Sequence, residues 1–240
     1  MAQAEALFPD GKAHERAIGQ WSRTVGRQFL NWMAIPPGRR WLDLECGDKS
    51  FVEELIVRCA PGELQRLAPS QAISLEDGAF DAAVLAQAIT VSPDPLVAVK
   101  QMARVTRPGG WVGAYMWDIT GGGEPTYPIS AGAKDLGIMF PKTGAADFSR
   151  IHVLCDLWRE VGLVQIDART IRVLVSYESF DDYWEASMQG GRLGEAIQSL
   201  TPEKRTQLHE HLRMTLPMDR DGGLSFYAWV NAVKGRVAAL

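Results

Sequence analysis

The segment WLDLECGDKS (residues 41–50) contains residue types that could bind a nucleotide cofactor. An apolar strand carries the acid Asp43 near its end, and a short loop with Gly47 then leads into a helix. In loops of this kind, glycines let the backbone turn sharply and approach a ligand without a Cβ in the way. Two positions where glycine would serve this purpose carry Glu45 and Lys49. The segment therefore predicts a cofactor loop that is working, modified or no longer functional.

Length and composition indicate one soluble α/β protein and exclude several functions. A chain of 240 residues can bury a full hydrophobic core, and its hydrophobic content of 46% is ordinary for a globular protein. The net charge of -4 and the pI near 5.6 do not suggest a nucleic-acid surface. Because the sequence has no long apolar run and no signal-peptide core at its N-terminus, we expect no nucleic-acid partner and no membrane association.

The cysteines and histidines predict neither disulfides nor a metal site. Cys46, Cys59 and Cys155 are odd in number and lack C-x-x-C spacing, so they are interpreted as reduced thiols of a cytoplasmic protein. His209 and His211 are two residues apart in a predicted helix, which places them on different sides. We therefore expect a solvated helix face there and no metal.

Strand and helix patterns alternate along the chain, which predicts a mostly parallel sheet with helices on both faces. An S-x-x-E pattern at Ser50 and Glu53 suggests that a helix is capped there. The glycine-rich stretch 120–128 is expected to be a loop, and Pro-Gly-Gly at 108–110 a turn. The helices are expected at residues 13–33, 50–59, 95–107, 147–163, 179–190 and 201–216. Strands are expected at 39–46, 80–89, 111–119 and 224–235, and residues 164–177 are expected to form one strand or a strand pair.

Three segments carry a resemblance to a known family. GRRWLDLECGDKS (38–50), EDGAFDAAVLAQAITVSPDPLVAVKQMARVTRPGGWVGAYMWD (76–118) and SFDDYWEASMQGG (179–191) resemble the class I S-adenosylmethionine (SAM)-dependent methyltransferases, closest to the small-molecule branch called type 11. The most specific feature is VTRPGG before one strand, with Phe-Asp opening the strand two elements earlier. The resemblance runs from about Trp21 to the C-terminus. It implies a doubly wound, Rossmann-like α/β methyltransferase sheet with helical cap elements.

The domain organisation is predicted to be simple. The sequence contains neither an internal repeat nor a low-complexity linker, so residues 1–240 are expected to form a single methyltransferase-like domain. Within it, residues 1–34 are predicted to form an N-terminal helical lid. Residues 178–218 are predicted to form a helical cap inserted before the last strand.

The resemblance also implies which residues would contact SAM. The family's first loop has an acid followed by three glycines at every second position, whereas here only the acid and the middle glycine are present. The carboxylate of Glu45 would face the carboxylate of SAM itself, and such a repulsion is worth several kcal/mol at an effective dielectric constant of about 20. Lys49 either offsets this charge or simply faces solvent. The cofactor-binding positions implied are Asp43, Glu45, Cys46, Gly47, Lys49, Ala86 and Gln87.

The region after the first loop is shorter than the family pattern. Only 33 residues separate Cys46 from Phe80, so about one βαβ unit is missing. ELQRLAPS (63–70) resembles the family's second strand, which would put Ala68 where relatives have the acid that binds the ribose hydroxyls. No third strand is found, so no residue can be assigned to the adenine. The sheet is therefore predicted to be shortened at one edge.

An acceptor pocket is implied near the end of the fifth strand of the family pattern and the segment FDDYW. Packing in the core or the cap is an equally good interpretation of each aromatic residue there. No catalytic residue is assigned, because Ile89 and Thr90 stand where relatives have Leu-His. The acceptor-binding residues implied are Tyr115, Trp117, Asp118, Tyr183 and Trp184.

These features favour a SAM-dependent methyltransferase fold with weakened or lost SAM binding, as in a non-catalytic homologue or the silent partner subunit of an active enzyme. The alternative is an active SAM-dependent methyltransferase with a small-molecule acceptor, and a third is a fold recruited to other chemistry. A sheet edge exposed by the shortening would favour a homodimer or a heterodimer with a methyltransferase homologue. Alternatively, Pro69 and the charged stretch 74–77 cover that edge.

Overall fold

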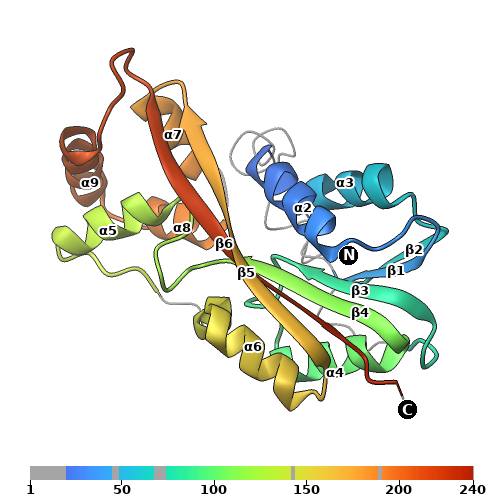
Figure 1. The fold of residues 1–240 in the computed structure, drawn as a ribbon. Coiled ribbons are helices and arrows are strands. Elements are labelled where there is room, and N and C mark those ends of the chain that lie inside the picture. The colour runs from blue at the N-terminus through green and yellow to red at the C-terminus, as the bar shows by residue number, and fades with distance from the viewer. Residues whose placement is uncertain (1–19, 45–48, 68–73, 142–143, 189–190, 240) are drawn as a thin grey trace.

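A six-stranded sheet forms the centre of the molecule (Figure 1). The computed structural model describes residues 20–44, 49–67, 74–141, 144–188 and 191–239. The strand order is β2-β1-β3-β4-β6-β5, in which β1 to β4 run parallel and β6 is antiparallel to both of its neighbours. The strands are β1 (Arg40–Leu44), β2 (Glu63–Leu67), β3 (Phe80–Ala86), β4 (Thr106–Trp117), β5 (Val164–Tyr177) and β6 (Leu224–Arg236).

Helices cover both faces of the sheet, which confirms the predicted α/β architecture. In Figure 1, α2 and α3 lie on one face and α4 and α6 on the other, and each pair covers its own hydrophobic cluster. The helices are α2 (Gln20–Met33), α3 (Lys49–Cys59), α4 (Pro95–Val105), α5 (Tyr127–Asp135), the 3-10 helix η2 (Ala146–Ser149), α6 (Ile151–Glu160), α7 (Phe180–Met188), α8 (Gly191–Gln198) and α9 (Pro202–Thr215).

The central strands form where the sequence is apolar on both sides. Strand β3 lies between β1 and β4, and Ala82 to Leu85 are completely buried because helices pack on both faces. Several helices begin at a capping residue followed by proline. Asp94 accepts a hydrogen bond from the N–H of Val97 at 3.0 Å, and Thr201 accepts one from the N–H of Lys204 at 3.4 Å.

The predicted turn at 108–110 is wrong, because these residues belong to β4. Pairing with β3 shifts register, so that Phe80 lies opposite Thr106 and Ala82 opposite Trp111. β4 therefore has more residues than β3 between these two pairs, and the extra residues form a bulge whose backbone geometry requires glycine. Gly109 has a φ of +72°, and a Cβ on Gly110 would lie 2.8 Å from the carbonyl oxygen of Asp81.

Two helices were not predicted, and one helix start was misplaced. α5 begins inside the stretch predicted to be a loop, and α8 is a short helix of eight residues with two glycines. α5 has only a weak apolar stripe, whereas α8 is amphipathic but short, and its two glycines disfavour a helix. Both helices are stabilised by tertiary contacts, α5 with α9 and α8 with α7. α3 begins at Lys49, so Ser50 lies within its first turn and the capping box predicted there is wrong.

The two long strands β5 and β6 extend beyond the rest of the sheet. Helices α7, α8 and α9 connect them, and together with α5 they gather around the far end of this pair (Figure 1). The hydrophobic cluster under α2 continues into this region through Val175, Tyr177 and Tyr183. The single-domain assignment of residues 1–240, with a lid at 1–34 and a cap at 178–218, stays a prediction.

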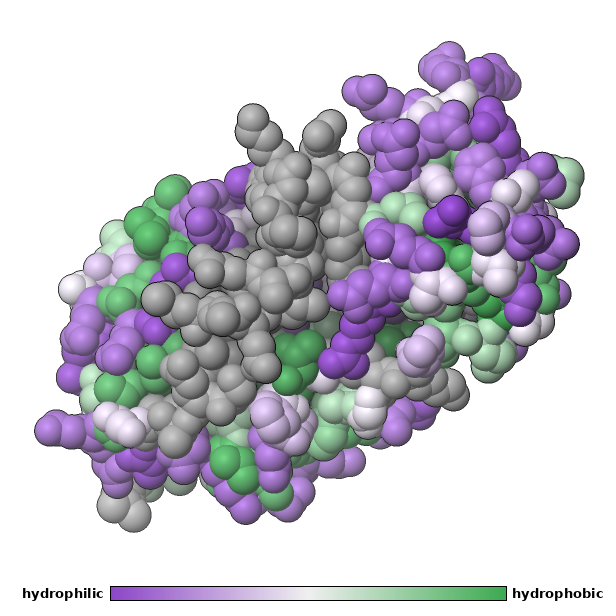
Figure 2. Space-filling view, turned by 180° about the vertical axis from the view of Figure 1, so that it is seen from behind, coloured by the Kyte–Doolittle hydropathy of each residue, from purple (hydrophilic) through white to green (hydrophobic). Residues whose placement is uncertain are grey.

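Exposed hydrophobic residues are scattered over the described surface. On the face seen in Figure 2, hydrophobic residues lie in small groups separated by hydrophilic ones. The most exposed are Val57 on α3, Met139 after α5 and Met214 on α9, at 80%, 73% and 79%. Isolated exposed side chains of this kind are normal on the surface of a globular protein. No helix in the described ranges has both the length and the apolarity needed to cross a membrane.

Candidate functional site

The strand order places a crevice at the carboxyl ends of β1 and β3. The chain moves outward from β1 to β2, then returns past β1 to form β3 on its other side. In doubly wound sheets, ligands bind where the strand order reverses in this way. The described residues nearest this point include Leu44, Lys49, Leu67 and Gln87, whereas Glu45, Cys46 and Gly47 lie outside the described residues.

Asp43 lies at this switch point next to a basic residue. It is completely buried in β1, and Arg66 is its direct neighbour in β2. The Arg66 Nε lies 4.0 Å from the Asp43 Oδ2, and about a third of the Arg66 side chain remains exposed. A buried carboxylate needs an opposite charge or hydrogen bonds to stay ionised. The neighbouring strand therefore supplies one positive charge to the acid of the predicted cofactor loop.

Gln87 connects the end of β3 to the N-terminal helix. It has a φ of +53°, which is uncommon for a residue other than glycine, and its N–H donates to the carbonyl of Tyr115 at 2.9 Å. The Gln87 Nε2 donates to the Ser22 Oγ at 2.8 Å, and Ser22 is completely buried. Helix α2 is thus joined to the carboxyl end of β3, directly after Ala86. Ser22 is a site residue that the sequence patterns did not indicate.

The described residues at the end of β2 do not provide the acid that a ribose would need. β2 ends at Leu67, and Ala68, the position implied for that acid, lies outside the described residues. The sequence from 68 to 73 is APSQAI, without a carboxylate. The next acids are Glu76 and Asp77, and Asp77 is paired with Arg104 in the last turn of α4. These residues do not fit the ribose of SAM.

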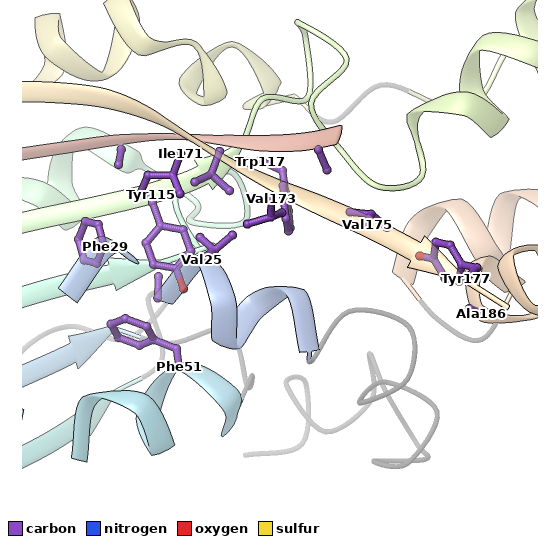
Figure 3. Packing of buried hydrophobic residues seen from close by; sticks show 14 of the residues in the cluster. Val25, Phe29, Phe51, Tyr115, Trp117, Ile171, Val173, Val175, Tyr177 and Ala186 are labelled. Carbon is purple, nitrogen blue, oxygen red and sulfur yellow. The ribbon is translucent and has the colours of Figure 1, made fainter. Parts of the chain in front are cut away.

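Tyr115 and Trp117 lie in the hydrophobic core beneath α2 (Figure 3). The Tyr115 ring centroid is 4.9 Å from that of Phe29 and 5.7 Å from that of Phe51, and the side chain is 1% exposed. Trp117 is 5% exposed and points toward the same face of the sheet. Both aromatic rings therefore pack between the sheet and the N-terminal helices.

Asp118 is fixed in a turn that follows β4. Its Oδ1 accepts a hydrogen bond from the N–H of Gly121 at 2.9 Å, and its Oδ2 accepts one from the Trp229 Nε1 at 3.2 Å. The turn is closed by the N–H of Gly123, which donates to the carbonyl of Asp118 at 2.8 Å. The carboxylate therefore has a defined position between the turn and β6.

Glu124 lies next to this turn, and the sequence analysis did not identify it. Burial raises the pKa of Glu124 to about 7, and the nearby charge of Asp118 adds to the effect. Glu124 is therefore a carboxyl group that can change its charge near neutral pH. The signal in the sequence was weak: Glu124 is the only charged residue between Asp118 and Lys134.

Tyr183 and Trp184 belong to the cap formed around β5 and β6. The Tyr183 hydroxyl donates to the carbonyl of Pro125 at 3.3 Å, which connects α7 to the loop that carries Glu124. Burial raises the pKa of Tyr183 well above its ordinary value. The ring centroid of Trp184 lies 5.1 Å from that of His209 on α9. The structure therefore brings Tyr183 near the Asp118 turn and places Trp184 between helices.

The histidines of α9 face two different helices. The His209 Nε2 lies 3.8 Å from an oxygen of Asp181 on α7, and the His211 Nε2 lies 3.6 Å from an oxygen of Asp135 on α5. They are partly buried, so the predicted solvated face is wrong, although the two residues do point in different directions. No group of three potential metal ligands is found among the described residues.

The site residues thus fall into separate groups. Asp43 and Lys49 are placed at the carboxyl end of β1, Ala86 and Gln87 follow β3, Tyr115 and Trp117 lie in the core, and Asp118 lies near the cap. Ile89 is completely buried and Thr90 is 5% exposed, so both are core residues. Fold and site together define a doubly wound α/β protein of the kind that binds a nucleotide cofactor at its switch point.

Comparisons with known proteins support the resemblance to methyltransferases. Residues 43–114 match the family model for a methyltransferase domain. Two solved structures share the fold at 12% identity. One is a protein of Bacillus halodurans with a provisional methyltransferase assignment (TM-score 0.52, covering 90% of this chain and 100% of that chain). The other is a Haloferax volcanii protein of equally provisional assignment, solved with the methyltransferase activator Trm112 (TM-score 0.54, covering 99% and 98%). No curated protein sequence matches the chain.

Residues 43–114 therefore resemble a methyltransferase domain, and the whole chain shares its fold with these two solved structures. The resemblance inferred from the sequence is therefore confirmed. The family implies SAM as the cofactor, and the residues of this chain decide whether SAM binds.

Proposed function

We propose that this protein has a methyltransferase fold with weakened or lost SAM binding, and that it acts as a non-catalytic homologue or as the silent partner subunit of an active enzyme. The observation that carries the proposal is the end of β2. This strand lies at the edge of the described sheet, and no acid follows it before Glu76. A charged hydrogen bond to the ribose, typically worth about 1.5–3 kcal/mol, would therefore be missing.

The first loop supports the same proposal. Glu45 and Lys49 replace two glycines of the family pattern, and a carboxylate at residue 45 would repel the carboxylate of SAM. Lys49 is exposed at the start of α3, and Arg66 faces Asp43 from the neighbouring strand. A second candidate function, an active methyltransferase with a small acceptor, is favoured by Glu124 and Asp118, because a carboxyl group that titrates near neutral pH can accept a proton.

Calorimetric titration with SAM and with S-adenosylhomocysteine tests the proposal. We expect a dissociation constant weaker than about 1 mM for both ligands, because losing two contacts of this size takes a micromolar site to millimolar. Micromolar binding would refute the proposal, and methyl transfer to small acceptors would then be assayed. Restoring glycine in the first loop shows whether the altered loop or the missing strand weakens SAM binding. Glu45→Gly combined with Lys49→Gly should tighten binding about tenfold or more if the loop is responsible, and should change little if the missing strand is.

A partner chain along the outer edge of β2 fits the proposal. No strand pairs with that edge within the described ranges, and sheet edges are usually paired or protected. The Haloferax volcanii relative was solved in complex with an activator protein, so association is known for this fold. We propose a homodimer or a heterodimer with a methyltransferase homologue. Light scattering should then give at least twice the monomer mass of 26.4 kDa, alone or after mixing with the homologue. A monomer in both cases would contradict the proposal.

The cellular location is proposed to be the cytoplasm. Cys59 and Cys155 are free thiols, and burial raises the pKa of Cys59 to about 11, so it is unreactive. Free thiols are usual in a reducing compartment. Cell fractionation would test this location, and recovery in a secreted fraction would contradict it.

A further inference from the structure

Three basic side chains of β5 and β6 alternate with two tryptophans, Trp32 at the end of α2 and Trp111 in β4. The guanidinium of Arg169 lies 4.8 Å from the ring centroid of Trp32, and the Lys234 Nζ lies 4.6 Å from the same ring. The Lys234 Nζ is also 5.0 Å from the centroid of Trp111, over which the guanidinium of Arg236 lies at 4.2 Å. We name these five residues the cation–tryptophan ladder.

The ladder carries more positive than negative charge. Asp167 is the carboxylate next to it, and the Asp167 Oδ2 accepts a hydrogen bond from the Trp32 Nε1 at 3.1 Å. Burial lowers the pKa of Lys234, and the charges of Arg169 and Arg236 lower it further, whereas Asp167 raises it. The shift is downward, so the positive neighbours and burial outweigh the one acid. Among the described residues, three cations against one carboxylate form a positive patch, whereas the net charge of the full sequence is -4.

Part of the ladder has a structural role. The Lys234 Nζ donates to the carbonyl of Trp32 at 2.7 Å, and the Arg236 Nη1 donates to the carbonyl of Gly109 at 2.7 Å. The first contact attaches the end of α2 to the sheet, and the second joins β6 to β4. They leave the charge itself uncompensated, since a carbonyl oxygen or an aromatic ring carries no net negative charge. Arg169 is exposed, and Lys234 and Arg236 are half-buried, so all three residues keep some contact with solvent.

We propose that the cation–tryptophan ladder is a docking surface for an acidic peptide segment of a partner protein. Lys234 and Arg236 are two residues apart on the same side of β6, and Arg169 lies beside them on β5. Alternate side chains of a strand are about 6.5–7 Å apart, which is also the spacing of alternate side chains in an extended peptide. Acids at every second position of such a peptide can therefore meet these cations one by one.

The surroundings favour an acidic peptide over a nucleic acid. Single-stranded nucleic acids bind largely by stacking bases on aromatic rings, but cations already cover the Trp32 and Trp111 rings. A long polyanion would also extend onto the remaining, net negative surface, where it would be repelled. A short acidic segment reaches only the positive patch. The proposal does not depend on whether SAM binds, so its failure would not affect the proposed function.

Fluorescence anisotropy with a labelled peptide in which glutamate alternates with serine tests this surface. At about 50 mM salt we expect a dissociation constant on the order of 10–100 µM that weakens about tenfold at high salt. Arg169→Glu should weaken binding about fivefold or more, and Arg169→Gln should weaken it less. Arg172→Glu is the matched control, because Arg172 is exposed on the opposite face of the same strand, and it should change binding less than about twofold.

The proposal would be overturned by no binding of the glutamate peptide or by equal binding of a peptide with glutamine in place of glutamate. The same loss with Arg172→Glu as with Arg169→Glu would also overturn it. Tighter binding of a DNA oligonucleotide of equal charge would overturn it in favour of a nucleic acid. Thermal unfolding of each variant shows whether the fold is retained, and Arg169→Gln serves as the test if Arg169→Glu does not fold.

Discussion

Replacing Tyr115 by alanine is expected to lower the free energy of unfolding by about 3–5 kcal/mol. The side chain is 1% exposed and contacts the rings of Phe29 on α2 and Phe51 on α3. Removing a large buried ring both exposes its neighbours and leaves a cavity that the rigid sheet cannot fill. Denaturation by urea, followed by circular dichroism, would measure the change.

Tyr227 provides the matched control for this prediction. It is a tyrosine in the neighbouring strand β6 but is 65% exposed, so Tyr227→Ala should change the unfolding free energy by less than about 1 kcal/mol. Similar effects of the two substitutions would contradict the assignment of Tyr115 to the core. A stable Tyr115→Ala protein that has lost binding of a small acceptor would instead support Tyr115 as an acceptor-binding residue.

Replacing Glu124 by glutamine is expected to stabilise the protein in alkaline solution and to have little effect in acid. The pKa of Glu124 is raised from 4.5 to about 7 in the folded protein. Below the lower value both states hold the proton. As the pH rises to about 7, the unfolded chain has lost it while the folded protein still binds it, so stability falls. Above about 7 the full cost of burying the charged carboxylate is present, so the gain from Glu124→Gln reaches a plateau there.

The size of this effect follows from the shift in the Glu124 pKa. One pKa unit corresponds to about 1.4 kcal/mol, and because Glu124 is partly exposed we expect a gain of about 1–3 kcal/mol near pH 8. Urea denaturation of both proteins at about pH 4.5 and about pH 8 would measure it. Glu185→Gln, at an exposed glutamate of α7, is the control and should behave like the original protein at both pH values. An equal gain at both pH values for Glu124→Gln would show that the raised pKa is not the cause.

The sequence by itself determined the central part of the fold. Continuous apolar runs such as the one beginning at Phe80, alternating with amphipathic helices, predicted a mostly parallel sheet with helices on both faces, and the structure confirms it. These patterns are informative because a strand buried on both faces is apolar along its whole length, whereas a helix buried on one face has apolar residues at helical spacing. The short spacing between Cys46 and Phe80 likewise predicted the shortened sheet, and β2 lies at the edge within the described chain.

Other features were decided only by the tertiary structure. α5 has only a weak apolar pattern, and α8 is a short helix whose amphipathic sequence is interrupted by glycine. Both form through contacts with other helices, so local sequence did not reveal them. The segment at 108–110 has the composition of a turn, but β3 pairs with the residues on either side of it, and Gly109 and Gly110 form backbone hydrogen bonds with Val237, directly after β6. The raised pKa of Glu124 depends on burial and on the charge of Asp118. The pairing of Asp43 with Arg66 depends on strand register. Residue type and spacing record which side chains are buried, whereas the charges and contacts around a site arise from segments far apart in the sequence, which only the folded chain brings together.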